Sequence, residues 1–273
     1  MTDASPASNR SLTIVTGYFT MKSKFPQHEY KRWINNFLKL KENMVIFTDL
    51  ENYDFIHKQR NAVNTYIIVT SIEDFNVYQY LSYWQYCKLI DIEKQIHSKE
   101  LYMIWNEKPY FIQRAMASNP FNSEYFFWMD IGCIRDSNML SHIEKFSSQN
   151  IPHDRVILSR VSNCRLNPIL NNNGISLDLQ NCEGKSCNVI NYIQGGYFGG
   201  HIDALLVWID LFTRELELFI KTKTFGGKDQ YIFNNISLKY SECIICLQPK
   251  DYPLFNTWFS FLIRMKNISA EIT

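Results

Sequence analysis

The chain has 273 residues, of which 46% are hydrophobic and 15% aromatic, so it can bury the core of one large α/β domain or two small ones. Its 28 basic and 27 acidic side chains lack the basic surplus that a general nucleic-acid-binding protein needs. The polar segment 1–10 has no apolar core typical of a secretory signal, and no stretch approaches 18 consecutive apolar residues. We therefore expect a cytoplasmic protein without a transmembrane segment, while its oligomeric state is left open.

The first third of the chain alternates between strand and helix patterns. Runs rich in apolar and β-branched residues predict strands over 11–19, 43–49 and 65–71. Apolar residues at helical spacing predict helices over 30–38 and 51–61 between them. This order predicts a doubly wound sheet that binds a nucleotide at its carboxyl edge. The GxGxxG turn is absent after the first strand, which disfavours a dinucleotide oxidoreductase.

The middle of the chain contains the most apolar strand. Long helices are expected over 73–96 and 101–117, the second broken or kinked near its start by Pro109. The run YFFWM at 125–129 predicts a strand buried on both faces, and Asp130 follows it directly. A short helix over 138–146 and a strand within 154–160 come next.

The last part of the chain contains further strand and helix patterns after a long polar segment. Residues 162–188 are polar and indicate a long excursion, where binding loops often lie. A strand over 189–193 leads into the glycine-rich segment 194–200. Helices over 201–219 and 228–238, a strand over 243–247 and an aromatic end over 252–263 that folds back complete the pattern. No repeat or linker separates these elements, so we expect a disordered tail at 1–10 and a single domain over 11–273.

Three segments carry residues suited to chemistry. Asp130 at a buried strand end could hold a divalent cation that binds a diphosphate, and Gly132 would let a ligand approach. The alternative is a strand that ends in an ordinary turn. The glycines of 195–200 indicate either a close approach to the backbone or a tight turn before the next helix. Asp229 either caps its helix or faces a sugar hydroxyl.

Two single residues also have more than one interpretation. Lys108, just before Pro109, is either a surface lysine or a phosphate contact. His201 could bind a metal or a phosphate, although a helix-start residue is the simpler interpretation. Seven cysteines in an apparently unsecreted chain predict free thiols.

Several segments together resemble a known family. In chain order they are TIVTGYF, EYKRWINNFL, MVIFTD, WNEKPYFIQRA, FFWMDIGCIRD and QGGYFGG. This set resembles the HtrL/YibB family over roughly residues 12–250. The resemblance implies a GT-A-like, Rossmann-like α/β domain with a mixed central sheet flanked by helices. It also implies a hexosyl-type glycosyltransferase that takes a nucleotide-diphosphate sugar, UDP-linked, in glycan or lipopolysaccharide-type synthesis. Members occur in bacteria, eukaryotes and large viruses, so a viral or host-cell cytoplasm is also consistent.

The resemblance assigns donor-binding roles at the ends of the first two strands. Thr16, Gly17 and Tyr18 would line the nucleotide pocket, and Asp49 would reach the base or ribose.

At the next strand, Asp130 matches the first acid of a DxD motif, which contacts the ribose and a diphosphate bound to Mn²⁺ or Mg²⁺. The sequence departs from the motif, because Gly132 stands at the third position. Asp136, His201 or water would have to replace that metal ligand, so we predict Asp130 and His201 as metal ligands.

The resemblance also assigns residues around the transferred sugar. Gly195 and Gly196 would face the donor sugar, and Asp229 and Gln230 match a DQ pair in which the acid acts as general base of an inverting enzyme. Lys108 would stabilise charge on the leaving nucleoside diphosphate. The acceptor would be a glycan or another hydroxyl compound. Gly132 motivates the alternative, a non-catalytic module that binds a nucleotide-sugar or a glycan.

Overall fold

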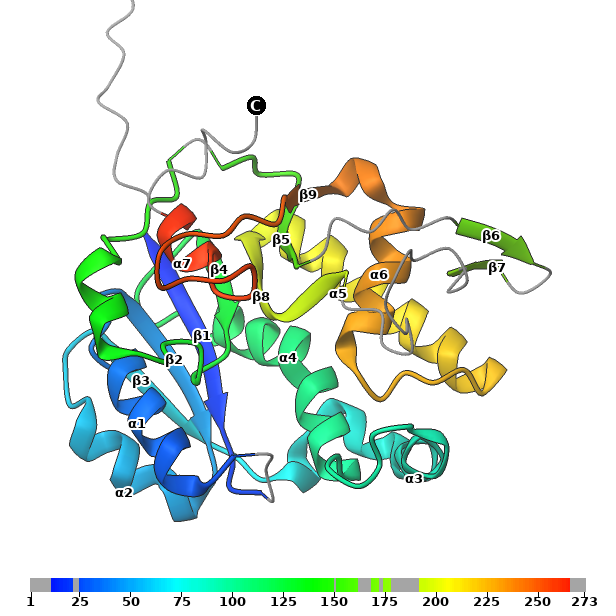
Figure 1. Ribbon diagram of the computed structural model, residues 1–273, viewed down its shortest axis with the longest axis horizontal. Helices are drawn as coiled ribbons and strands as arrows, with labels where there is room; N and C mark the ends of the chain where they lie inside the picture. The colour runs from blue at the N-terminus through cyan, green and yellow to red at the C-terminus, as the bar shows by residue number, and fades with distance from the viewer. Residues whose placement is uncertain are drawn as a thin grey trace, which may run out of the picture.

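The computed structural model describes residues 11–21, 25–149, 151–161, 168–171, 174–177 and 192–265. The predicted tail at 1–10, most of the excursion at 162–188 and the start of the strand predicted at 189–193 lie outside these residues. Within them, seven strands form a mixed sheet and helices cover both of its faces (Figure 1). This arrangement confirms the predicted α/β fold with a mixed, helix-flanked sheet.

The sheet has the order β3-β2-β1-β4-β8-β5-β9. Its strands are β1 (Leu12–Tyr18), β2 (Asn43–Thr48), β3 (Thr65–Val69), β4 (Tyr125–Met129), β5 (Val156–Arg160), β8 (Ile193–His201) and β9 (Ile244–Leu247). The first four pair in parallel, whereas β8 is antiparallel to both β4 and β5. A separate hairpin joins β6 (Pro168–Asn171) and β7 (Gly174–Leu177).

Strand β4 lies at the centre of the sheet, and each of its residues is buried. Side chains of successive strand residues point to opposite faces. Phe126 and Trp128 therefore join one core, while Tyr125, Phe127 and Met129 join the other. The unbroken apolar run thus reflects a strand covered by helices on both sides.

Each face of the sheet has its own helices. One face carries α1 (Gln27–Phe37), α2 (Leu50–Gln59) and α7 (Phe261–Arg264). The other carries α3 (Leu81–Ile90), α4 (Lys99–Ser118), α5 (Ile202–Thr222) and α6 (Asp229–Lys239). Figure 1 shows α4 at the centre of the molecule, where it packs against β4 and β1. No helix in the described part of the chain is long and apolar enough to cross a bilayer.

The long helix predicted over 73–96 is instead two short 3₁₀ helices, η1 (Ile72–Asp74) and η2 (Asn76–Tyr80), followed by α3. The reason lies in α4, where the buried Glu107 carboxylate accepts hydrogen bonds from the backbone N–H groups of Asn76 and Val77. These bonds make η2 begin as a separate helix after η1. Helix α4 itself continues through Pro109 to Ser118.

Two more predictions need correction. The helix predicted over 138–146 is a shorter 3₁₀ helix, η3 (Ser137–His142), whose start is capped by the Asp136 side chain. Of the two interpretations of 194–200, the tight turn is wrong, because the segment is part of strand β8. Its neighbour β4 explains the glycines, since a Cβ at Gly199 would lie 2.3 Å from the ring of Phe127. The C-terminal segment folds back as expected, with Phe255 and Phe261 buried.

Candidate functional site

Three charged side chains from distant segments meet at the carboxyl edge of the sheet. The Lys108 ammonium on α4 lies 3.1 Å from the carboxylate of Asp130, which follows β4. It lies 2.9 Å from the carboxylate of Asp229, which opens α6. It also donates a hydrogen bond of 2.9 Å to the backbone carbonyl of Gly195 in β8. Lys108 therefore ties together three of the elements that surround the site.

The three charges differ in their access to solvent. The side chains of Lys108 and Asp229 are 3% and 4% exposed, whereas that of Asp130 is 46% exposed. Burial acts to lower the pKa of Lys108, but the two carboxylates outweigh it and raise the pKa, so the ammonium stays charged. Asp130 is the most exposed member of the cluster.

A bulge in β8 brings its backbone to this cluster. Leu158 of β5 pairs with Phe198, but Arg160 pairs with Ile193. An advance of two residues along β5 therefore lies opposite an advance of five residues along β8. Extra residues in one strand bend it and redirect its backbone, as β-bulges next to active sites commonly do. Here the Gly196 carbonyl accepts the backbone N–H of Asp130 at 2.9 Å. A Cβ at Gly195 would lie 2.2 Å from Asp229, so the bulge requires glycine.

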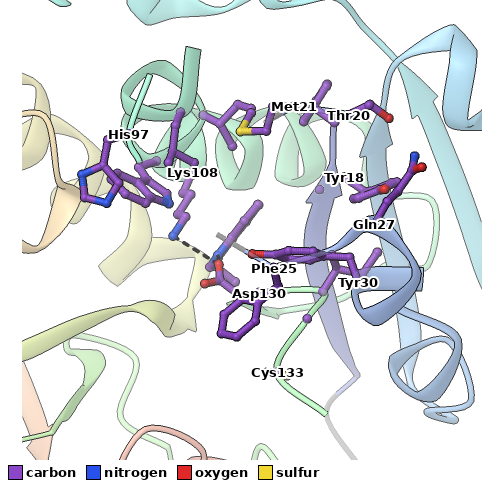
Figure 2. Close-up of a pocket in the computed structure, with 18 of the residues that line it drawn as sticks. Tyr18, Thr20, Met21, Phe25, Gln27, Tyr30, His97, Lys108, Asp130 and Cys133 are labelled. Atoms are coloured by element: carbon purple, nitrogen blue, oxygen red, sulfur yellow. Dashed lines mark hydrogen bonds and ion pairs between the residues drawn. The ribbon is translucent and has the colours of Figure 1, made fainter. Parts of the chain in front are cut away.

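The cluster opens into a cavity of about 630 Å³. Small-molecule sites commonly have volumes of 300–1,000 Å³. Five of the predicted site residues line it: Gly17, Tyr18, Lys108, Asp130 and Gly132. Figure 2 shows the Lys108–Asp130 pair between His97 on one side and Phe25 and Tyr30 on the other. The cavity is mostly apolar, with a few polar groups gathered at the end of β4.

The other predicted residues do not line the cavity. Thr16 is buried and donates a 2.6 Å hydrogen bond to the Met129 carbonyl, which fastens the ends of β1 and β4 together. Asp49 caps α2. Gln230 donates to the Ile193 carbonyl at 2.9 Å and so holds the start of β8. Asp229 does not line the cavity, because Lys108 stands in front of it.

Asp130 and His201, which we predicted as joint metal ligands, are far apart. His201 pairs with Tyr125 at the start of β4, whereas Asp130 follows the end of that strand. Five residues of strand correspond to about 17 Å, much more than one ion can bridge. His201 instead accepts the backbone N–H of Asp203 and caps α5. The structure thus corrects the predicted pair of metal ligands.

The oxygen atoms near Asp130 show how the site could hold the predicted Mn²⁺ or Mg²⁺. Oδ1 of Asp130 contacts both Lys108 and the Trp128 indole, which donates to it at 2.8 Å. Oδ2 makes no hydrogen bond within the described part of the chain. A Cβ at Gly132 would face Trp33 at 3.7 Å, so an acid there would point toward aromatic rings. Mg²⁺ is commonly bound by one carboxylate together with substrate phosphates. The site fits a cation in that way, through Asp130 and a diphosphate.

The structure adds a cationic residue that the sequence did not single out. Arg135 lines the cavity, and its guanidinium lies 3.6 Å from the centre of the Trp33 ring. Phe25 and Phe259 lie near the same guanidinium, each with its ring centre at 5.4 Å. No ion pair with Arg135 is formed by the described residues, so its charge is available to a ligand. Its place five residues after Asp130, in the same loop, is the signal that could have identified it.

Comparisons with known proteins agree with the sequence resemblance. A family model described as "Bacterial protein of unknown function (HtrL_YibB)" matches residues 10–201. The search of curated proteins gives no match.

Three solved structures show distant similarity. The apo form of mouse xyloside xylosyltransferase 1 is 11% identical with a TM-score of 0.43, over 87% of this chain and 85% of that protein. A 4-diphosphocytidyl-2C-methyl-D-erythritol synthase from Anaerococcus prevotii is 9% identical with a TM-score of 0.38, over 96% and 99%. The PaToxG glycosyltransferase is 12% identical with a TM-score of 0.36, over 85% and 70%.

Similarity at this level does not define what the chain acts on. The family model, in contrast, spans well over half of the sequence and includes β1, β4 and the glycine-rich strand β8. The chain therefore belongs to the HtrL/YibB family.

Proposed function

We propose that this protein is a glycosyltransferase that moves a hexosyl group from a nucleotide-diphosphate sugar, UDP-linked, to an acceptor hydroxyl in glycan or lipopolysaccharide-type synthesis. The observation that supports this most is the position of Asp130. It is a partly exposed carboxylate at the end of a central strand, it opens into a cavity of about 630 Å³, and a buried lysine stands beside it. Ligands of open α/β sheets bind at this edge.

The charges of the cavity suit a leaving diphosphate. The Lys108 ammonium and the Arg135 guanidinium both line the cavity with Asp130. Preorganised positive charge in a site shielded from water stabilises the charge that develops on a leaving group. Arg135 can in addition form two parallel hydrogen bonds to phosphate oxygens. We assign these two residues to the diphosphate.

The aromatic side of the cavity suits the nucleoside. Tyr18, Phe25 and Tyr30 line this part, and Phe25 and Tyr30 contact each other edge to face, with ring centres 6.2 Å apart. A base gains stacking energy on such rings whatever its hydrogen-bonding edge. Gly17 leaves the end of β1 open beside them.

A divalent cation, Mn²⁺ or Mg²⁺, remains part of the proposal. It would be held by Asp130 together with the donor diphosphate, and it would neutralise charge on the leaving group. We expect Mn²⁺ to bind weakly without a nucleotide, because the described residues offer a single carboxylate at the cavity.

The test is the isosteric substitution Asp130→Asn. It keeps an acceptor for the Trp128 indole but removes the charge. We expect release of nucleoside diphosphate to fall by at least 10²-fold, the scale found when one electrostatic contact of a transition state is removed. The matched control is Asp136→Asn, an exposed acid of the same loop that caps η3 and does not line the cavity. Full activity of Asp130→Asn would contradict the assignment.

The alternative is a module that binds a nucleotide-sugar or a glycan without turning it over. It is favoured by Gly132, which leaves the cavity one carboxylate short of the DxD motif. Calorimetric titration with UDP-, GDP- and TDP-sugars, with and without Mn²⁺, combined with a nucleotide-release assay separates the two functions. Tight binding without release in the presence of acceptors would support the module.

A further inference from the structure

We propose that His97 is the general base of this reaction and that Asp91 positions it. The inference rests on the proposed function, because it assigns the residue that receives the proton of the acceptor hydroxyl. His97 lies between α3 and α4 and lines the same cavity as Lys108 and Asp130.

Asp91 is a buried carboxylate with several donors around it. Its residue is 4% exposed, and its Oδ2 lies 2.8 Å from Nδ1 of His97. The same oxygen accepts a 2.6 Å hydrogen bond from the Tyr102 hydroxyl. Its Oδ1 accepts the backbone N–H of Glu93 at 2.8 Å.

These bonds decide which nitrogen of His97 carries a proton. Burial acts to raise the pKa of Asp91, but hydrogen bonds from Tyr102, Glu93 and His97 outweigh it and lower the pKa. Asp91 is therefore ionised and can only accept, so Nδ1 of His97 must be the donor. In neutral His97 the other nitrogen, Nε2, is then the basic one.

The segment that carries His97 is held in place on several sides. The Lys88 ammonium donates to the carbonyls of Lys94 and His97. Lys228, next to Asp229, forms an ion pair with Glu93. Lys88, Glu93, Lys228, Asp91 and Tyr102 are thus the charged and titratable groups that these contacts connect to the segment. A base held this way keeps its orientation when a substrate binds.

The position of His97 in the cavity fits the acceptor. It precedes Leu101 by about one helical turn, and a stripe of α4 that includes Leu101, Trp105 and Lys108 forms this wall. Its ring meets Trp105 edge to face at 5.1 Å. Figure 2 shows it across the Lys108–Asp130 pair from the aromatic residues that we assign to the nucleoside. With the diphosphate at that pair, the sugar and the acceptor lie on the His97 side.

The other acids at the site are poorly placed for this role. Asp229 is 4% exposed in its side chain and is paired with Lys108. Asp130 is engaged by Lys108 and Trp128 and would bind the diphosphate. We therefore transfer the role of general base from Asp229, where the sequence resemblance had placed it, to His97.

The proposed step is a direct displacement. The acceptor oxygen forms a bond to the anomeric carbon of the sugar. The bond from that carbon to the diphosphate oxygen breaks, and its electron pair leaves with the nucleoside diphosphate. The hydroxyl proton moves to Nε2 of His97, and the imidazolium so formed is stabilised by the Asp91 carboxylate, as in other histidine bases paired with an aspartate.

The experiment compares pH–rate profiles and donor affinities of the full-length protein. In the wild type we expect turnover to fall as the pH is lowered, since a protonated imidazole cannot accept a proton. We call this decrease the acid limb of the profile. His97→Gln should lose at least 10²-fold in kcat and lose this acid limb, while its Kd for the donor, measured by calorimetry, changes less than about threefold. Asp91→Asn should lower kcat and move the acid limb to lower pH.

One control separates chemistry from folding. His28→Gln replaces a histidine whose side chain is 78% exposed and should have no effect. If His97→Gln does not fold, the wild-type and Asp91→Asn profiles decide, and a wild type without an acid limb overturns the inference.

The remaining outcomes are also distinguishable. A folded His97→Gln variant with wild-type turnover and an unchanged acid limb overturns the role of His97 and leaves the glycosyltransferase intact. A loss of donor affinity that accounts for the whole loss of turnover makes His97 a donor contact instead of a base. If the wild type neither binds nor cleaves any nucleotide-sugar, the proposed function fails, and the inference fails with it.

Discussion

Lys108 is a buried ammonium group whose charge is compensated by two carboxylates from different elements. Its side chain is 3% exposed, as is appropriate for an ion pair shielded from water. The removal of one partner from such a pair leaves an unpaired buried charge, which typically costs 3–5 kcal/mol. The same residue also contacts the Gly195 carbonyl, so it supports the β8 bulge as well as the proposed diphosphate site.

We predict that Lys108→Met lowers the free energy of unfolding by about 3 kcal/mol, because the buried Asp229 loses its counter-charge. The second substitution Asp229→Asn should recover part of this loss in the double variant. Urea denaturation of the wild type, both single variants and the double variant measures the coupling. Lys99→Met, which removes a half-exposed partner of Glu100, is the control and should change stability by less than about 1 kcal/mol. Strictly additive effects of Lys108→Met and Asp229→Asn would contradict the prediction.

At the scale of single residues, the sequence identified the acids and the lysine but not their partnership. Lys108 and Asp229 are separated by more than a hundred residues, and no local pattern brings them together. The interpretation of Lys108 as a surface lysine is excluded by its burial. Arg135 was missed although it lies five residues after Asp130 in the same loop. His97 was missed because its signal is three-dimensional: it becomes visible only when the end of β4, the start of α4 and the C-terminal segment enclose one cavity.

Strand β8 is the element that most defines the site. Its glycine-rich composition, however, is not typical of a strand. Glycine is unfavourable in a strand interior, so the glycine-rich segment at 194–200 indicated either a tight turn or a close approach to the backbone. The neighbours of β8 reverse that preference. Gly199 lies against Phe127 of β4, and Gly195 lies against Asp229 of α6, each at a distance that excludes a Cβ atom. These requirements arise from segments far along the chain, which local propensity does not include.

We predict that Gly199→Ala destabilises the protein by about 3 kcal/mol, because its Cβ would overlap the Phe127 ring at 2.3 Å and the Phe126 carbonyl at 2.4 Å. Thermal unfolding followed by circular dichroism measures the change. Gly132→Ala is the matched control, since its Cβ has an ordinary contact of 3.7 Å with Trp33. A Gly199→Ala variant as stable as Gly132→Ala would show that β4 and β8 can separate at little cost.

At the scale of the whole molecule, one buried acid connects stability to pH. Glu107 is fully buried where α4 meets η2. Burial raises its pKa to about 7, despite hydrogen bonds from Asn76 and Val77. The native protein then retains a proton on Glu107 between about pH 4.5 and 7, where the unfolded chain has lost it. Its contribution to stability is therefore present at low pH and is lost as the pH rises through 7.

We predict that the stability advantage of the wild type over Glu107→Gln shrinks by about 3 kcal/mol between pH 4.5 and 7.5, since each unit of pKa difference corresponds to 1.36 kcal/mol. Urea denaturation across this range measures it, with the exposed Glu73→Gln as control. A difference between wild type and Glu107→Gln that is independent of pH would contradict the prediction.

The overall architecture was largely predictable, because strongly periodic segments decide it. The run at 125–129 corresponds to β4, and the first three strands and two helices fall where the pattern placed them. The antiparallel insertion of β8 between β4 and β5 could not be read from local signals, since pairing depends on segments distant in the sequence. The parallel half of the sheet therefore follows from the pattern, whereas the half that completes the site needs the structure.

The sheet order also has a consequence for how the protein is made. β1 pairs with β4, with Leu12 beside Tyr125, and β4 pairs with β8 still further along the chain. Pairings between segments so far apart form slowly, because a long loop must close first. During synthesis, β1, β2 and β3 can associate early, but Lys108 has no partner at residue 229 until α6 has left the ribosome. The site is thus among the last parts of the molecule to assemble, and a chain that stops before α6 would leave the buried Lys108 without one of its two carboxylate partners.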